Sequence, residues 1–270
     1  MPYVTTADGL RAYFDHAGDP TDGRTPLVMV HGASQDSLSW QHNLDFFGQH
    51  YAVYALDLPG HGKSGMPAGG PHTDSPSNAR HVLQVIDALG LDRPVLMGHS
   101  MGGGVVAAAA ALAPQRVRGL VFVDGASVNV VKSSGYNPAI LDMARINPGD
   151  WFEVSFRTLM GSGTDAARAE EIVMDARRCI PEVAFADIRA FGGFRMETLL
   201  DQLQCPCVIV EGAEDWSVPP ESARNVDAAL QARGIPTVYL EWPGVGHFPH
   251  SEQPATFNVE TLAALQRLDL

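Results

Sequence analysis

A serine stands at the centre of a Gly-x-Ser-x-Gly pattern made by Gly98, Ser100 and Gly102. A short apolar run of strand type precedes the pattern over residues 94–97, and a helical run rich in Val and Ala follows over 105–112. A sharp turn between a strand and a helix presents a serine hydroxyl, and the glycines leave room for that turn. The amides and dipole at the start of the helix favour negative charge beside the serine. The pattern therefore predicts that Ser100 is a nucleophile.

Such a serine requires a base within hydrogen-bond reach and an acid that orients the base. Functional groups of a parallel sheet gather at the carboxyl ends of its strands, so the candidates are residues that follow a strand. Asp215 follows one apolar run of strand type, and His247 follows the next. The order nucleophile, acid, base is that of hydrolases with a nucleophile elbow. The sequence therefore predicts a catalytic triad of Ser100, Asp215 and His247.

Two other carboxyl groups compete with Asp215 for the role of the acid. Asp124 also follows an apolar run of strand type, and Glu214 directly precedes Asp215. Both stay open as alternatives, because each lies where a strand is predicted to end. His250, three residues after His247, is interpreted as a solvent-facing or loop-packing group.

A tetrahedral intermediate requires hydrogen-bond donors for its negatively charged oxygen. One candidate is the amide of Met101, directly after the nucleophile, and the other is the amide of Ala33, in the loop after an apolar run. We expect His31 to hold this loop by hydrogen bonds. The Ser34 hydroxyl is predicted either to contact a substrate oxygen or to cap the turn.

The elements that must position these residues alternate between strand and helix in most of the chain. The sequence predicts a β-hairpin over 3–14 and strands over 26–30, 51–56, 94–97, 120–123, 206–210 and 237–240. Helical patterns are found over 40–47, 79–89, 105–112, 219–232 and 254–268. Such alternation is typical of βαβ units and a parallel sheet.

A long segment without a strand pattern interrupts this alternation. Helices are predicted over 138–146, 151–159, 165–178 and 181–191. We therefore expect an α/β core formed by residues 1–126 and 197–270, with residues 127–196 as a helical cap. The breaks Asn147-Pro148-Gly149 and Gly161-Ser162-Gly163 are predicted to let the cap move as a lid.

Composition excludes several other classes of protein. Lys and Arg number 18 against 31 Asp and Glu, so the formal net charge is −13, which opposes binding to nucleic acid or an anionic membrane. The first residues do not resemble a signal peptide, and the apolar runs are too short for a membrane span. The three cysteines follow neither a disulfide nor a metal-ligand pattern. We expect a soluble cytoplasmic protein that acts on a small molecule, as a monomer or a homodimer.

The motifs together resemble the α/β-hydrolase superfamily over nearly the whole chain. The matching segments are His31-Gly32 with Trp40, residues 57–64, residues 98–103, Gly212 with Asp215, and Gly246-His247 with Glu252 and Pro254. The resemblance implies a mostly parallel eight-stranded sheet with helices on both faces and a helical cap between the sixth and seventh strands. It also implies that no metal or organic cofactor is needed.

Within that superfamily the residues favour a serine carboxylesterase. Members that cleave carbon–halogen bonds or epoxides have Asp where this chain has Ser100. The C–C bond hydrolases of the meta-cleavage-product type, which are the alternative enzyme, usually have Asn and Trp at the positions of His99 and Phe248. Haloperoxidase-like members usually have an aromatic residue at the position of Ala33. Lactonases and thioesterases look similar to this chain, and a non-catalytic ligand receptor is the alternative outside enzymes.

Aromatic residues are the candidates for substrate binding. Trp216 and Phe248 lie in loops beside the predicted acid and base, and Trp151 lies in the helical insertion. The insertion also contains Phe152, Phe156, Phe185, Phe191 and Phe194, for which packing between helices is the default interpretation. Its arginines Arg157, Arg189 and Arg195 could bind a carboxylate, although solvation is the expectation for most.

Overall fold

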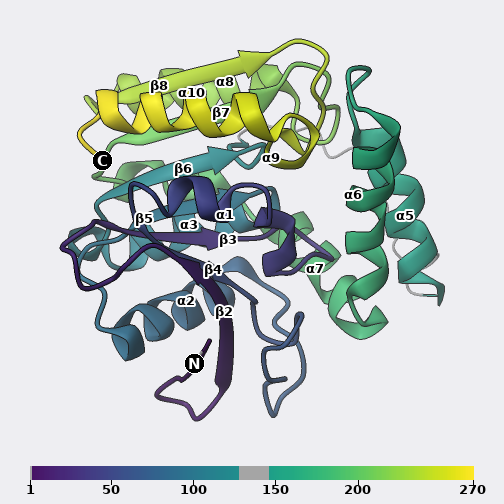
Figure 1. The fold of residues 1–270 in the computed structure, drawn as a ribbon, viewed down its shortest axis with the longest axis horizontal. Coiled ribbons are helices and arrows are strands. Elements are labelled where there is room, and N and C mark those ends of the chain that lie inside the picture. Colours follow the sequence, from purple (N-terminus) through teal and green to yellow (C-terminus); the bar gives the residue numbers. More distant parts are fainter. Residues whose placement is uncertain (1, 128–145) are drawn as a thin grey trace.

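The computed structural model describes residues 2–127 and 146–270, and its centre is an eight-stranded sheet in the order β1-β2-β4-β3-β5-β6-β7-β8 (Figure 1). The strands are β1 (Tyr3–Thr5), β2 (Arg11–Ala17), β3 (Pro26–Val30), β4 (Ala52–Leu56), β5 (Val95–His99), β6 (Gly119–Val123), β7 (Cys207–Gly212) and β8 (Thr237–Trp242). β2 pairs antiparallel with β1 and β4, and the other neighbours pair in parallel. This confirms the predicted mostly parallel α/β sheet.

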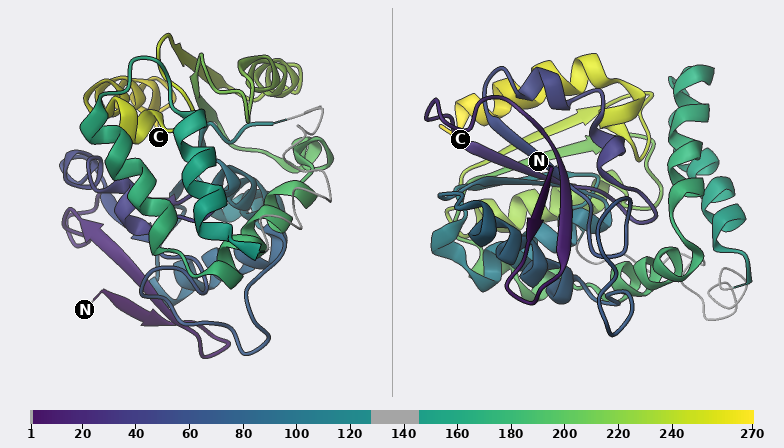
Figure 2. Two further views of the ribbon diagram at one scale, coloured as in Figure 1. Left: turned by 90° about the vertical axis from the view of Figure 1, so that its right-hand side faces the viewer. Right: turned by 60° about the horizontal axis from the view of Figure 1, so that its bottom comes forward.

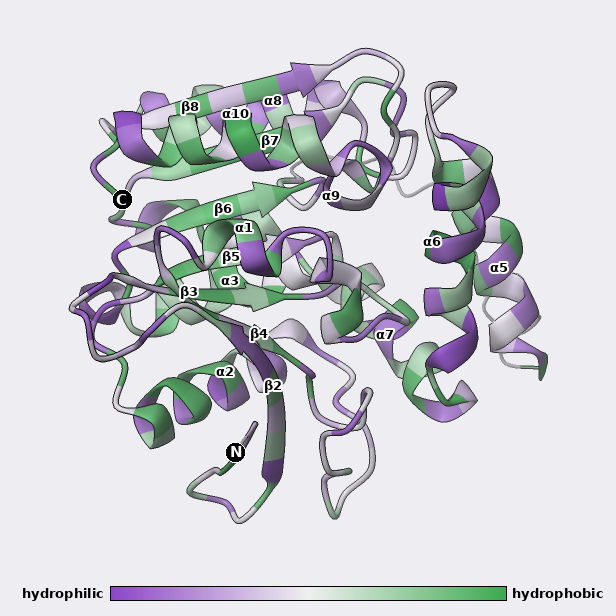
Figure 3. Cartoon of the chain, in the orientation of Figure 1, coloured by the Kyte–Doolittle hydropathy of each residue, from purple (hydrophilic) through white to green (hydrophobic). Residues whose placement is uncertain are grey.

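The central strands are buried on both faces, as their continuous apolar sequences require. Along β3, Leu27 and Met29 pack into a cluster with residues of α1 (Leu44–Phe47) and α10 (Pro254–Arg267). Val28 and Val30 face the opposite cluster, with α2 (Ser75–Leu89), α3 (Met101–Leu112) and α8 (Pro220–Gln231). β3 and β6 are hydrophobic over most of their length (Figure 3). Helices therefore cover both faces of the sheet.

The boundaries of several helices differ from the sequence-based expectation, and capping residues explain two of the differences. The helix predicted over 40–47 is divided into a 3₁₀ turn, η1 (Ser37–Trp40), and the short α1. Asp36 caps η1 by accepting the Leu38 amide, which starts the helical turn before residue 40. α2 begins at Ser75 rather than 79, because Asp74 caps it by accepting the Ser77 amide. The helix predicted over 138–146 lies almost wholly outside the described residues.

Three helices stand beyond the carboxyl ends of the strands. They are α5 (Pro148–Leu159), α6 (Ala166–Arg178) and α7 (Pro181–Gly193), and the arrowheads of β3, β6 and β8 point toward α5 and α6 (Figures 1 and 2). The remaining elements are the 3₁₀ turns η2 (Pro114–Arg116), η4 (Met196–Thr198) and η5 (Leu200–Gln202) and the short helix α9 (Pro249–Glu252). In the described parts of the chain, no helix is both long and apolar enough to cross a bilayer. The boundaries of a cap domain stay a prediction.

The glycine-rich break between α5 and α6 is tightly packed. A Cβ atom on Gly161 would lie 2.4 Å from the carbonyl oxygen of Gly244, a contact that side chains cannot make. The Gly163 amide donates to the same carbonyl at 2.8 Å. At the other break, Asn147 caps α5 by accepting the Asp150 amide. In this structure the glycines at 161–163 allow close backbone contact, and movement of these helices as a lid stays a prediction.

Candidate active site

Ser100 is the single residue between the end of β5 and the start of α3. Its backbone has φ 51° and ψ −118°, a strained conformation for a residue with a side chain. A Cβ atom on Gly98 would lie 2.3 Å from the carbonyl oxygen of Gly102, so this turn admits no side chain there. The structure thus confirms the predicted strand, sharp turn and helix around the serine.

The structure brings Ser100, His247 and Asp215 together from three separate segments. His247 Nε2 lies 2.8 Å from Ser100 Oγ, and His247 Nδ1 lies 2.6 Å from Asp215 Oδ2. The second oxygen of Asp215 accepts the amides of Ser217 and Val218 at 2.7 and 3.2 Å. These amides hold the Asp215 carboxylate in place. Because the carboxylate accepts from His247 Nδ1, the ring proton lies on Nδ1 and the lone pair of Nε2 faces the serine.

The two alternative acids are directed elsewhere. Asp124 is fully buried, and its Oδ1 accepts the Gly212 amide at 2.9 Å. Burial, with the neighbouring Asp215, raises the pKa of Asp124 well above its usual range. Glu214 is exposed and accepts the amide and hydroxyl of Ser162 at 2.6 and 2.7 Å. Asp215 therefore holds the hydrogen-bonding position on the imidazole.

Glu211 is a buried carboxyl group that the sequence analysis missed. It lies on β7, is 0% exposed, and shares a side-chain hydrogen bond with the neighbouring carboxyl group of Asp124. Burial, followed by the proximity of Asp124, raises the pKa of Glu211 well above its usual range. Both shifts favour the neutral forms of Asp124 and Glu211, which lie beside the Asp215 carboxyl group that contacts His247. The sequence feature that could have revealed Glu211 is a glutamate directly after an apolar run of strand type.

The loop after β3 is held by His31, as expected. His31 Nδ1 donates to the Gly32 carbonyl at 2.8 Å, and the Leu58 amide donates to His31 Nε2 at 3.1 Å. Burial, with His61 nearby, lowers the pKa of His31 to about 4, so the ring is neutral and these two roles are compatible. The amide of Ala33 in this loop has no acceptor among the described residues. Met101 begins α3, so its amide lacks a partner within the helix.

A cavity opens beside Ser100 and His247. Trp151, Trp216 and Phe248 line it with Ala33, as predicted, whereas Met101 is buried without lining it. The other lining residues are Gln35, His99, Phe152, Ser155, Phe156, Leu159, Ile188, Phe191 and Ser217. None of these described lining residues is Asp, Glu, Lys or Arg. The cavity is therefore mostly apolar and uncharged.

A family comparison agrees with this geometry. The alpha/beta hydrolase family model matches residues 27–260. The chain belongs to the alpha/beta hydrolase family. The match confirms the predicted fold class and the resemblance on which the hydrolase prediction was based.

Relatives of this hydrolase are named for different activities. The non-heme chloroperoxidase of Streptomyces lividans is 29% identical over 279 residues, covering 97% of this chain and 99% of that protein. An acetoin-cleaving-system component from Cupriavidus necator, a dihydrolipoyllysine-residue acetyltransferase, is 37% identical over 129 residues. That match covers 48% of this chain and 33% of the relative, so this chain matches about a third of its length. The solved structure of a thermophilic esterase from Thermogutta terrifontis superposes with a TM-score of 0.84 at 23% identity, covering 99% of this chain and 98% of the other.

Four of the aromatic residues that the structure describes in the hydrolase's helical insertion line the cavity. These are Trp151, a predicted substrate-binding residue, and Phe152, Phe156 and Phe191, for which the interpretation of packing alone is wrong. Phe152 and Phe156 do both, since they also belong to a buried cluster with Phe248. The arginines proposed for carboxylate binding do not line the cavity; Arg157, for example, pairs with Glu170 at 2.9 Å.

Ser34 does not occupy a position for substrate binding. It is 0% exposed and is not among the residues that line the cavity. Its amide donates to Asp187 at 2.8 Å and its hydroxyl to the Ala176 carbonyl at 3.4 Å. Asp187 also pairs with the buried His61 at 2.9 Å. Ser34 therefore joins the β3 loop to α6 and α7, because the packed helices cover it.

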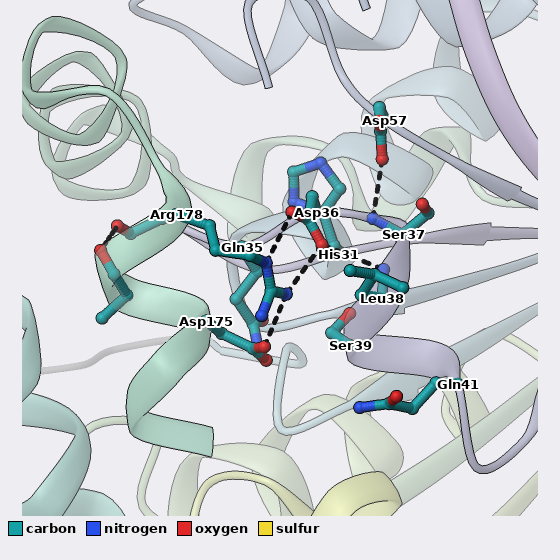
Figure 4. A network of polar contacts seen from close by, with 12 residues as sticks. His31, Gln35, Asp36, Ser37, Leu38, Ser39, Gln41, Asp57, Asp175 and Arg178 are labelled. Carbon is teal, nitrogen blue, oxygen red and sulfur yellow. Dashed lines mark hydrogen bonds and ion pairs between the residues drawn. The ribbon is translucent and has the colours of Figure 1, made fainter. Parts of the chain in front are cut away.

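A second connection to α6, missed in the sequence, involves Gln35 (Figure 4). Gln35 Oε1 accepts the Gly32 amide at 3.1 Å, and its Nε2 donates to Asp175 at 3.2 Å. Beside it, Arg178 forms two hydrogen bonds with Asp36 at 2.9 and 3.0 Å. Burial raises the pKa of Asp175 to about 6, although Arg178 opposes that shift. These contacts hold α6 against the loop that contains Ala33.

His250 is fully buried, so the solvent-facing interpretation is wrong and the packing interpretation is right. Its ring centroid lies 4.5 Å from that of Trp40 and 4.5 Å from that of His99. Both of its nitrogens lack a partner in the described residues. Burial, with His247 nearby, lowers the pKa of His250 to about 3, which keeps it neutral.

Two groups of three potential metal ligands occur in the described residues: Asp124, Asp215 and His247, and His61, Cys179 and Asp187. In each group the histidine already pairs with an aspartate, at 2.6 and 2.9 Å respectively. Burial raises the pKa of the third member, Asp124 or Cys179, which keeps it protonated. A metal would have to displace both a hydrogen bond and a proton, so neither group is arranged for one.

Proposed function

We propose that this protein is a serine hydrolase that cleaves carboxylic esters of small, largely apolar substrates. The observation that carries the proposal is the continuous contact from Asp215 through His247 to Ser100 at the wall of an apolar cavity. That arrangement supplies a nucleophile, a base and an orienting acid in one place.

In the first half of the proposed reaction, Ser100 Oγ attacks the acyl carbon of the ester. His247 Nε2 takes the hydroxyl proton and then returns it to the leaving alcohol oxygen. Asp215 stabilises the imidazolium that forms between these steps. The amides of Ala33 and Met101 donate to the carbonyl oxygen while it carries negative charge.

In the second half, water replaces the alcohol and attacks the acyl group on Ser100. His247 again acts as the base, so the carboxylic acid leaves and the serine recovers its proton. Every proton moves between the substrate, the water and residues of this chain, so the proposal requires neither a metal nor an organic cofactor.

The lining of the cavity supports an uncharged, partly aromatic or aliphatic substrate. Trp151, Phe156 and Phe248 present apolar surface within reach of Ser100, and a charged substrate group would lose its hydration there without gaining a partner. We assign α5, α6 and α7 the role of a cap that selects the acyl group. Trp216 belongs to the same wall, because its Nε1 donates to the Thr158 carbonyl of α5 at 2.7 Å.

The test is a panel of esters, lactones, thioesters and amides, with acyl chains of increasing length, given to the wild type and to Ser100→Ala. We expect hydrolysis of neutral esters by the wild type and its loss in the variant. A fluorophosphonate should also add to the wild type once per chain, with the modified peptide containing Ser100.

Three results would contradict the proposal in different ways. If a C–C bond substrate of the dienone type were cleaved and esters were not, the alternative enzyme would be correct. If no substrate turned over and no fluorophosphonate adduct formed, a non-catalytic receptor would be favoured. A folded Ser100→Ala variant that kept more than about a tenth of the activity would exclude the serine as the nucleophile.

A further inference from the structure

Glu252, the last residue of α9, has a buried carboxyl group that is 4% exposed. It accepts four hydrogen bonds. Oε1 accepts the Phe248 amide at 2.9 Å, and Oε2 accepts the Gly246 amide at 3.0 Å, the Gly161 amide at 2.8 Å and the Thr164 hydroxyl at 2.5 Å. Buried acceptors of this kind are satisfied only when the donors around them are correctly placed.

Two of these donors flank His247 directly. The amides before and after the histidine both donate to Glu252, while the amide of His247 itself donates to the Leu159 carbonyl at 2.8 Å. The carbonyl oxygen of His247 lies 2.7 Å from His99 Nε2. Three consecutive amides around the histidine are therefore held, two of them by one side chain.

The other two donors belong to the segment between α5 and α6. Gly161 and Gly246 pack so closely that a Cβ atom on Gly246 would lie 2.1 Å from the Leu159 carbonyl oxygen and 2.5 Å from the Gly161 amide nitrogen. No side chain fits between the two segments, so Glu252 reaches both of them from one position. The loop that contains His247 and the end of a cavity-lining helix thus form one packed unit.

We propose that Glu252 is a positioning residue that sets the orientation of His247 toward Ser100 and couples it to the wall of the cavity. This inference rests on the proposed function, in which His247 is the base. A carboxylate has acceptor sites for all four donors, whereas a Gln amide offers one oxygen and turns its NH₂ group toward donors. Without the carboxylate, the amides around His247 would lose their partners and the ring would move from the serine.

The experiment compares Glu252→Gln with Glu214→Gln, a matched control. Glu214 also accepts hydrogen bonds from the α5–α6 segment, through Ser162, but it is exposed and makes no hydrogen bond to the amides around His247. We expect Glu252→Gln to lower kcat about 10- to 100-fold, because sub-ångström displacement of a base slows proton transfer. KM should change by less than about threefold, since the cavity wall keeps its side chains. Glu214→Gln should stay within about twofold of the wild type.

A second readout separates positioning from a general loss of structure. The rate at which a fluorophosphonate modifies Ser100 also depends on His247, so it should fall in parallel with kcat in Glu252→Gln at temperatures well below its unfolding midpoint. If Glu252→Gln does not fold, Glu252→Asp takes its place, since its shorter carboxylate keeps the charge but loses reach. Either variant, folded and with wild-type kcat and labelling rate, would overturn the inference while leaving the proposed function intact. A wild type that neither hydrolyses esters nor reacts with the fluorophosphonate would overturn both.

Discussion

A carboxyl oxygen of Asp124 lies within 4.8 Å of a carboxyl oxygen of Asp215, at the ends of two neighbouring strands. Both residues are buried, and two negative charges so close in a poorly solvated site repel each other strongly. Asp215 accepts two amides and the imidazole, whereas Asp124 accepts one amide. Asp215 therefore has more hydrogen bonds to stabilise a carboxylate, whereas burial and the proximity of Asp215 raise the pKa of Asp124 well above its usual range.

This asymmetry predicts different effects of two conservative substitutions. Asp215→Asn should lower kcat by about 10³- to 10⁴-fold, because the imidazole loses the partner that sets its tautomer. Asp124→Asn should change kcat by less than about threefold, since an amide still accepts the Gly212 hydrogen bond and a neutral group replaces a neutral group. Steady-state kinetics on the best ester measures both. A large loss of kcat in Asp124→Asn with a small loss in Asp215→Asn would instead make Asp124, which follows β6, the catalytic acid.

Ser100→Ala and His247→Ala should each remove nearly all hydrolysis and lose similar amounts of activity. The reason is that the residues of a triad act as a unit, so removing either one leaves only the rate supplied by binding and the oxyanion donors. The double variant should be no slower than either single variant, within about threefold. Additive losses in the double variant would argue against a shared step. Circular dichroism provides the control for folding.

Acid should destabilise the protein through His250. Its folded-state pKa of about 3 lies below the ordinary value of 6.5, so the unfolded chain takes up this proton first as the pH falls. Above pH 6.5 His250 is mostly neutral in both the folded and the unfolded state. Below pH 6.5 the unfolded state binds a proton that the folded state does not, so the free energy of unfolding decreases by about 1.4 kcal/mol per pH unit. Between pH 7 and pH 5 the loss should be about 2 kcal/mol.

Urea denaturation of His250→Phe at several pH values measures this contribution. The variant's free energy of unfolding, relative to the wild type, should rise by about 2 kcal/mol from pH 7 to pH 5. The aromatic ring keeps the packing against Trp40 and His99, and any packing defect cancels in the comparison across pH. His16→Phe changes an exposed histidine and should leave the difference constant. Parallel curves for His250→Phe and the wild type would contradict the prediction.

Selectivity for the acyl group should depend on aromatic residues of α5. Trp151→Ala or Phe156→Ala should change the ratio of kcat/KM for long and short acyl esters by about 1–3 kcal/mol, the scale of methylene-sized contacts. Phe185→Ala is the matched control, because Phe185 belongs to the neighbouring α7 and does not line the cavity. An unchanged ratio in both cavity variants would transfer selectivity to the loops around Ala33, Trp216 and Phe248.

The sequence by itself determined the sheet, the elbow and the order of the three candidate catalytic residues. Continuous apolar runs over residues 26–30 and 120–123 indicate strands that are buried on both faces, as central strands of a parallel sheet are. This pattern can be recognised within a few consecutive residues. The glycines around Ser100 report a turn that excludes side chains. Helices α5, α6 and α7 were also evident, since each has its own helical pattern.

Only the tertiary structure decided which acid contacts His247, which aromatic residues line the cavity and that the glycines at 161–163 are packed. Asp124 and Asp215 both follow strands, and only their hydrogen bonds separate them. Glu252 and Gly161 are 91 residues apart, so no local pattern shows that one accepts the other's amide. Periodicity describes the surroundings that a residue shares with its chain neighbours. The distance between two distant segments depends instead on how the helices pack over the end of the sheet.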